Sequence, residues 1–349
     1  MGGGGSFTAP LTGTGVLTPG TIRTITDDTK YNAWPQIVRL SNGSLMMAYT
    51  KGDSHNNDNT GKIVGRVATE ANAILGTWGA EFDIADETLG AINVSLGSLA
   101  SGRVVAVYNL YDFTASPTTP VDAVRVRYSD DFGSTWSSAY TVNSAFTGTC
   151  SNGTAHLIQK ANGTVMMAVY GKNSGATYYS ASVFSSTDDG ATWGSELIVS
   201  NGPGDSRQYY EPSLTLLDDG TILFLTRNDD SLNMFQQRST DGGATWTNPA
   251  VAFAGLSPGN AVQLPSGTLI SPVRDSTTLQ LVASTSLNDG TTWATPAVLA
   301  SGFFENEYAC PVPLTTAYTT MIVYSVQPTS ALTNADIKTI VVTEGTTPA

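Results

Sequence analysis

One eight-residue motif occurs four times in the sequence, with the consensus Ser-x-Asp-x-Gly-x-Thr-Trp. The copies occupy residues 129–136, 186–193, 239–246 and 286–293, and a degenerate fifth copy ends at Trp78. In such a segment the Asp accepts hydrogen bonds from nearby backbone N–H groups, the Gly supplies a positive φ, and the Trp packs between layers. The motif therefore predicts a repeated hairpin turn with a structural rather than a catalytic role.

A second repeat lies upstream of each motif, where a turn ends in Gly and a run of apolar residues follows. These glycines are Gly43, Gly102, Gly163, Gly220 and Gly267. Apolar runs bounded by turn signals indicate buried strands. A sixth unit without the motif runs from about Tyr308 to Val342. The repeat predicts six units of four strands each.

Six such units favour an all-β fold, a six-bladed β-propeller, over the linear solenoid that is the alternative. Closure into a ring removes exposed sheet edges, and we expect the segment near residues 21–25 to add a strand to the last blade. Hydrophobic residues make up 40% of the chain and charged residues only 13%, which suits strands and tight turns better than helices. We expect one domain over residues 7–349, preceded at residues 1–6 by a Gly-rich segment typical of an engineered linker.

The net charge of −13 argues against nucleic acid or an anionic membrane as a partner, since both require a basic surface. No stretch reaches the ~18 apolar residues that cross a bilayer, so we expect no membrane insertion. The N-terminus lacks the pattern of a signal peptide, and we expect a secreted or extracellular protein whose native leader has been removed. Cys150 and Cys310 fall in blades on opposite sides of the axis, which predicts two free thiols.

Polar residues recur at fixed offsets from the turn glycines, where buried strands should be apolar. Nine residues before these glycines stand Trp34, Asn93, Thr154 and Glu211, and a short shift in the sixth unit adds Tyr308. Seven residues after them stand Thr50, Asn109, Tyr170, Arg227 and Arg274. The innermost strands of a propeller start at one axial end, so these offsets predict a single site there. Ordinary alternatives are an ion pair between Glu211 and Arg227, a solvated Arg274, and aromatic packing of Tyr308.

The repeated motif resembles the Asp-box of the sialidase family, and the similarity extends from about residue 30 to the end of the chain. The fourth-blade segment of the family is similar to residues 210–214 and 225–227 of this chain. Its sixth-blade segment is similar to residues 307–311, 322–324 and 336–338. The resemblance implies that Tyr308 is a nucleophile and Glu211 its base. It also implies that Arg227 and Arg274 bind the substrate carboxylate.

The family's acid/base Asp lies in the loop after the second strand of blade one, here residues 51–60. The resemblance implies Asp58 for this role, with Asp53 in reserve, and a polar turn is the alternative for both. His55 shares the loop and is either solvated or in contact with sugar.

The sequence differs from the family at one position that bears on the choice of substrate. The first Arg of the family's triad is replaced here by Ala33, within the segment Asn32-Ala-Trp-Pro35. A sialic acid would lose one charge-assisted contact of roughly 1.5–3 kcal/mol. Either the substrate is not a sialic acid, or another Arg reaches the site.

Three hypotheses follow. The first is a retaining exo-glycosidase of the sialidase type, acting on a terminal sialic acid or related acidic sugar of a glycan or glycoconjugate. The second is a glycosidase or lyase on another polysaccharide, similar to exo-arabinanases, with stacking platforms at Trp34, Tyr111, Tyr209 and Tyr210. The third is a non-catalytic glycan-binding propeller. None requires a cofactor, and we expect no metal in the chemistry.

Overall fold

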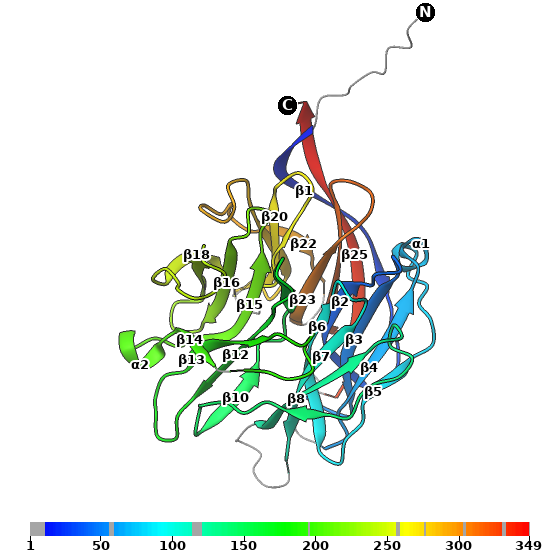
Figure 1. The fold of residues 1–349 in the computed structure, drawn as a ribbon. Coiled ribbons are helices and arrows are strands. Elements are labelled where there is room, and N and C mark those ends of the chain that lie inside the picture. The colour runs from blue at the N-terminus through cyan, green and yellow to red at the C-terminus, as the bar shows by residue number, and fades with distance from the viewer. Residues whose placement is uncertain are drawn as a thin grey trace, which may run out of the picture.

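The computed structural model describes residues 11–55, 59–113, 121–194, 196–255, 259–275, 277–302, 305–329 and 333–348. It forms six antiparallel sheets, so the predicted six-bladed propeller is confirmed (Figure 1). Each blade begins with its innermost strand. The first blade comprises β2 (Tyr31–Arg39), β3 (Leu45–Gly52), β4 (Lys62–Ala68) and β5 (Phe82–Ala85). The second comprises β6 (Gly90–Ser98), β7 (Val104–Tyr111), β8 (Val121–Ser129) and β9 (Tyr140–Thr141).

The third and fourth blades follow the same order, except that the innermost strand of blade three is divided. Blade three comprises β10 (Thr149–Asn152), β11 (Ile158–Gln159), β12 (Val165–Lys172), β13 (Ser180–Ser186) and β14 (Leu197–Ser200). Blade four comprises β15 (Tyr210–Leu216), β16 (Ile222–Asn228), β17 (Asn233–Ser239) and β18 (Ala250–Ala254).

The last two blades lead back to the start of the chain. Blade five comprises β19 (Val262–Gln263), β20 (Leu269–Arg274), β21 (Leu281–Ser286) and β22 (Ala297–Ala300). Blade six comprises β23 (Glu305–Pro313), β24 (Thr319–Gln327), β25 (Asp336–Pro348) and β1 (Leu11–Thr24). Two short helices, α1 (Glu70–Ile74) and α2 (Gly202–Asp205), lie in connections, and no helix in the described ranges is long and apolar enough to span a membrane.

Apolar clusters fill the spaces between neighbouring blades, and five of the six contain one tryptophan from a motif. These are Trp78, Trp136, Trp193, Trp246 and Trp293. The cluster between blades five and six has no such tryptophan and is bordered by Leu17 of β1. This difference matches the sequence, because the sixth unit is the one without the motif.

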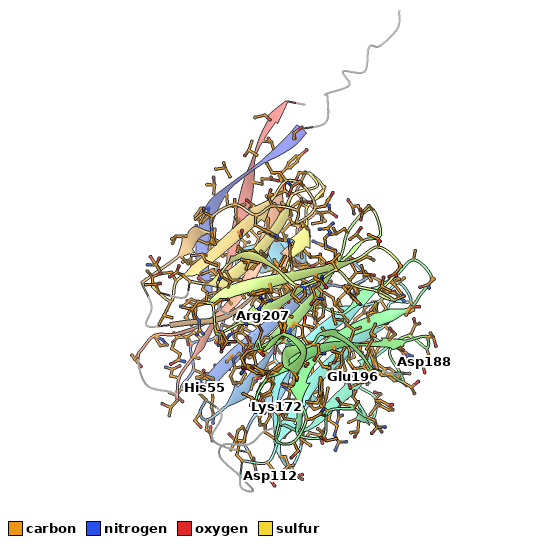
Figure 2. The ribbon with its side chains drawn as sticks, turned by 90° about the vertical axis from the view of Figure 1, so that its left-hand side faces the viewer. His55, Asp112, Lys172, Asp188, Glu196 and Arg207 are labelled. Carbon is orange, nitrogen blue, oxygen red and sulfur yellow. The ribbon has the colours of Figure 1, made fainter. Side chains whose placement is uncertain are left out.

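The Asp-boxes form the turns that follow the third strands of blades two to five. In one of them Asp131 accepts a 2.8 Å hydrogen bond from the Thr135 N–H and a 2.6 Å bond from the Thr135 hydroxyl. Gly133 has a φ of 94°, which an L side chain rarely adopts. Asn288 replaces the Asp in the last copy and keeps the 2.9 Å bond from the Thr292 N–H. Figure 2 shows Asp188, from another copy, at the outer edge of the molecule and apart from His55.

Pairing between the two ends of the chain closes the ring. β1 runs antiparallel to β25, with Leu17 opposite Glu344 and Ile22 opposite Ile340, and both strands extend beyond the blades at the top of Figure 1. The prediction of a strand from residues 21–25 is therefore confirmed. The strand is longer than expected, because it continues back to Leu11. Cys150 in β10 and Cys310 in β23 are both free thiols, as predicted.

A buried carboxylate ties this closing pair to blade five. Glu344 is 2% exposed and accepts bonds from the Ser266 hydroxyl at 2.7 Å, the Thr268 hydroxyl at 2.5 Å and the Gly15 N–H at 3.1 Å. Three donors from two segments thus converge on one side chain. Removal of the carboxylate would leave them without an acceptor.

We expect Glu344→Ala to lower the free energy of unfolding by about 1–3 kcal/mol, because three donors, of which the Thr268 hydroxyl is buried, lose their acceptor. Chemical denaturation monitored by fluorescence measures the change. Asp83→Ala is the control, since Asp83 pairs with Lys62 at the surface and should contribute less than about 1 kcal/mol. Equal effects of the two substitutions would contradict the proposed role of Glu344.

Candidate active site

The innermost strands share one backbone irregularity, at the position nine residues before each turn glycine. Trp34, Asn93, Thr154 and Glu211 all have left-handed backbone conformations, with φ of 52°, 57°, 53° and 46°. The strand register shifts across three of them, between Ala33 and Gln36, Ile92 and Ser95, and Tyr210 and Ser213. A bulge redirects the side chain it carries and interrupts pairing, which explains why polar residues recur there.

Side chains from other blades form hydrogen bonds with backbone groups at these bulges. The Trp34 N–H donates to the Ser325 hydroxyl at 3.4 Å, and the Asn93 N–H donates to the Thr50 hydroxyl at 3.0 Å. The Thr154 carbonyl accepts a 2.9 Å bond from the Gln36 side chain. The bulges are thus held by contacts between blades, and β23 repeats the irregularity between Asn306 and Ala309, where Tyr308 lies.

Glu211 of β15 and Tyr308 of β23 meet at this level, although 97 residues separate them in the sequence. The Tyr308 hydroxyl donates a hydrogen bond to Glu211 Oε1, and both residues are buried, with exposures of 9% and 7%. Arg227 Nη1 donates to the other oxygen, Glu211 Oε2, at 3.0 Å. Both carboxylate oxygens are therefore occupied.

The environment of Tyr308 keeps its phenol protonated. Burial raises the pKa of Tyr308 well above its ordinary value of 10, and the negative charge of Glu211 raises it further, while Arg227 acts in the opposite direction. A phenol in this state attacks a carbon only if a base accepts its proton. Glu211 is the group placed to do so.

Arg227 has a second carboxylate partner that the sequence analysis did not identify. Its Nε donates to Asp229 Oδ1 at 2.5 Å and its Nη2 to Asp229 Oδ2 at 3.1 Å, a bidentate arrangement. Burial alone would lower the pKa of Arg227, but Glu211, Tyr308 and Asp229 raise it. The predicted ion pair between Glu211 and Arg227 is present, and it belongs to a larger network.

Aromatic rings surround the Glu211–Tyr308 pair on the side of blade one. The Trp34 ring lies 6.4 Å from the Tyr308 ring, measured between centroids. His55 lies 5.2 Å from Tyr31 in a stacked arrangement and 5.3 Å from Trp34 edge-on. The loop histidine is therefore part of an aromatic cluster, in contrast to its alternative as a solvated side chain.

A second aromatic group comes from blades three and four. Tyr179 and Tyr210 have ring centroids 4.7 Å apart, and Tyr170 lies 5.9 Å from Tyr210. Lys172 Nζ is 4.6 Å from the centroid of Tyr179. Burial raises the pKa of Tyr210 to about 12, so its hydroxyl is neutral at physiological pH. These half-buried tyrosines combine apolar faces with hydroxyl groups, as sugar-binding surfaces do.

Of the remaining predicted residues, one lies outside the described ranges and another is engaged in an ion pair. Asp58 is among residues that the structure does not describe. Asp53 forms an ion pair with Lys30, which lowers the pKa of Asp53 and so opposes a role as proton donor. Asn93 is half-buried, and its carbonyl accepts a 2.6 Å bond from Asn152. Arg274 ends β20, at the place that corresponds to Arg227 in the neighbouring blade.

The suggested stacking platform at Tyr209 is wrong, because that ring is fully buried and packs edge-on against Phe235. Strand alternation explains the error, since neighbouring residues face opposite sides of a sheet and Tyr210 takes the accessible side. Tyr179 and Asp229 were missed. Tyr179 precedes β13 and Asp229 follows β16, so neither shares an offset from a turn glycine.

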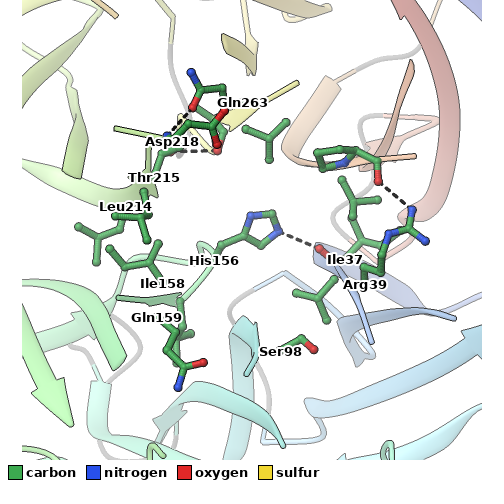
Figure 3. A pocket seen from close by; sticks show the side chains of 17 residues that line it. Ile37, Arg39, Ser98, His156, Ile158, Gln159, Leu214, Thr215, Asp218 and Gln263 are labelled. Carbon is green, nitrogen blue, oxygen red and sulfur yellow. Dashed lines mark hydrogen bonds between the residues drawn. The ribbon is translucent and has the colours of Figure 1, made fainter. Parts of the chain in front are cut away.

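A separate cavity of about 360 Å³ opens at the other end of the axis, where the innermost strands finish (Figure 3). Its polar residues already hold blades together. Gln159 accepts a 2.7 Å bond from the Ala100 N–H, and Gln263 accepts a 2.9 Å bond from the Asp218 N–H. His156 projects into the cavity and its Nε2 bonds the Ile37 carbonyl at 2.8 Å. We therefore place the candidate site at the Glu211 end.

No group of three His, Cys, Asp or Glu side chains is arranged to hold a metal within the ranges the structure describes. The described residues bring a phenol, two carboxylates and a guanidinium into contact at the site.

The contact with Glu211 generates a prediction about pH. The phenol of Tyr308 should not ionise near its ordinary pKa of 10 in the folded protein, because burial and Glu211 disfavour phenolate. Above that pH the unfolded chain loses this proton and the folded chain keeps it, so the contribution of Tyr308 to stability should decline as pH rises. The ionisation of Tyr308 is measured as the difference in near-ultraviolet phenolate absorbance between the wild-type protein and Tyr308→Phe during a pH titration. The same difference for the denatured proteins is the control. A folded-state transition near pH 10 would rule out this environment.

Comparisons with known proteins support the fold. A family model described as a BNR repeat-like domain matches residues 43–316. No curated protein matches the sequence. A solved protein of unknown function from Dyadobacter fermentans is 16% identical, with a TM-score of 0.79 over 94% of this chain and 99% of that one.

Two enzymes share the fold at similarly low identity. The intramolecular trans-sialidase from Ruminococcus gnavus, solved with oseltamivir carboxylate, is 13% identical with a TM-score of 0.69, over 92% of this chain and 96% of that one. The α-L-arabinanase from Penicillium chrysogenum, solved with arabinobiose, is 15% identical with a TM-score of 0.67, over 92% and 98%. The chain belongs to the BNR repeat-like domain family, and it has the six-bladed propeller fold of the sialidases that it resembles.

Proposed function

We propose that the protein is a retaining glycoside hydrolase in which Tyr308 is the nucleophile and Glu211 its base. The observation that carries the proposal is the buried hydrogen bond from the Tyr308 hydroxyl to Glu211. The bond joins blades six and four at the level of the bulges. Apolar packing alone does not account for a carboxylate, a phenol and a guanidinium in direct contact at a buried place.

The arrangement supports the following first step. As Tyr308 Oη attacks the anomeric carbon, its proton passes to Glu211 Oε1, and the bond from that carbon to the leaving oxygen breaks. Arg227 remains hydrogen-bonded to Glu211 Oε2 and orients the carboxylate. The leaving oxygen needs a proton from an acid, and Asp58 is our candidate because the sequence resemblance assigns it this role.

The second step reverses these roles. Water attacks the anomeric carbon of the tyrosyl–glycosyl intermediate and loses a proton to the conjugate base of the acid. The bond to Tyr308 Oη breaks, and the phenolate recovers its proton from Glu211. Two inversions at one carbon give net retention.

The surrounding aromatic residues suit a sugar ligand. His55 and Tyr210 are half-buried members of the two aromatic groups, and sugar rings pack their C–H faces against such surfaces. Trp34 is only 5% exposed, so its ring supports His55 and Tyr308 from within the core. The sugar implied by the sequence resemblance is a sialic acid. A glycoside without a carboxylate is the alternative, and the similarity of the fold to an α-L-arabinanase is consistent with it.

A screen of aryl glycosides tests the proposal, with an α-sialoside, a related 2-keto sugar acid and neutral furanosides and pyranosides. We expect turnover of at least one substrate, and Tyr308→Phe should reduce kcat about 10³-fold or more by removing the nucleophile. Glu211→Gln should also reduce kcat, because an amide cannot accept the proton.

Tyr140→Phe provides a matched control, since Tyr140 lies in β9 on the outer side of blade two. Wild-type turnover in Tyr308→Phe would exclude the tyrosine mechanism. Glycan binding without turnover of any substrate would favour the non-catalytic alternative.

A further inference from the structure

Asp229 occupies the edge of Arg227 formed by Nε and Nη2, one of the edges through which a guanidinium can bind a carboxylate. A guanidinium binds a carboxylate best through two parallel N–H groups. Asp229 takes such a pair, through Arg227 Nε at 2.5 Å and Nη2 at 3.1 Å. Glu211 takes Nη1 at 3.0 Å. Every nitrogen of this guanidinium therefore already donates to a carboxylate of the protein.

The charges around Arg227 also disfavour an anionic ligand. Two carboxylates, Glu211 and Asp229, contact this one cation, so the group of three carries a net negative charge. The side chain of Arg227 is 18% exposed, and water screens the group only partly. Ala33 stands where the resemblance places another Arg. A sugar carboxylate would meet repulsion from Asp229 and would have to displace it.

We propose that Asp229 is a specificity-determining residue, which excludes sugar acids by holding Arg227, so that the site accepts glycosides without a carboxylate on the anomeric carbon. This inference rests on the proposed function, because it assumes that the sugar binds beside Tyr308 and Glu211. Asp229 follows the last residue of β16 directly, so the strand that positions Arg227 also positions its partner.

The structure offers a matched pair of variants. Asp229 is 43% exposed at its side chain, and Asn has nearly the same size without the negative charge. The neighbouring carboxylate of Asp230 is directed elsewhere and accepts a 3.1 Å bond from the Gln208 N–H. Asp230→Asn therefore removes the same charge from the next residue and leaves the guanidinium engaged.

The experiment compares N-acetylneuraminic acid with its methyl ester, two ligands that differ in the carboxylate charge. Isothermal titration calorimetry should show that the wild-type protein binds the acid no more tightly than the ester. Asp229→Asn should shift the ratio of affinities toward the acid by about tenfold or more, which corresponds to ~1.4 kcal/mol. Asp230→Asn should leave the ratio unchanged. Asp229→Ala serves as a second variant, and circular dichroism checks that each protein is folded.

Several outcomes would overturn the inference. A wild-type preference for the acid of tenfold or more would show that Arg227 accepts a carboxylate with Asp229 in place. If neither Asp229 variant gains affinity for the acid, or if neither binds it at all, Asp229 does not control the access of a carboxylate to Arg227. The proposed function is tested separately, by the turnover of Tyr308→Phe. If Tyr308→Phe loses turnover but Asp229→Asn does not change the ratio of affinities, the mechanism stands and the role of Asp229 is wrong. If Asp229→Asn changes the ratio but the protein turns over no substrate, only the specificity role of Asp229 stands.

Discussion

Closure of the ring is the constraint on which the candidate site depends. Tyr308 comes from blade six and Glu211 from blade four, and their contact exists only if the blades complete a circle. β1 completes it by pairing with β25, and the buried Glu344 links that pair to blade five. Because the two termini form one sheet, opening this sheet would leave an unpaired edge on blade six and remove the fixed frame between phenol and carboxylate.

The repeats made the fold and part of the site predictable from the sequence. Asp-boxes mark blades two to five and a turn glycine marks each of blades one to five, so equal offsets from the glycines identify equivalent backbone positions. The offset of nine residues found Trp34, Asn93, Thr154 and Glu211, and these are the positions where the innermost strands adopt left-handed conformations. The recurrence of polar and aromatic side chains at this offset therefore marked the bulged positions. It did not show that a bulge in the backbone was the reason for the recurrence.

Residues outside that register could not be predicted in the same way. Asp229 lies one residue beyond β16, and its role depends on a bidentate contact that no repeat encodes. Tyr209 and Tyr210 are neighbours of the same type, and only the local direction of the strand decides that the first is buried and the second half-exposed. Spacing in the sequence also does not reveal that Asp53, one of the two candidate acids, pairs with Lys30.

The contrast between Arg227 and Asp229 suggests how one scaffold can serve different sugars. The position of Arg227 is set by a strand that pairs on both sides, with Tyr210 and Met234, so it changes little without a cost to the blade. Asp229 lies in the turn that follows, where substitutions affect few packing contacts. A change at the turn can thus release or occupy the guanidinium while the phenol, its base and the ring that holds them stay in place.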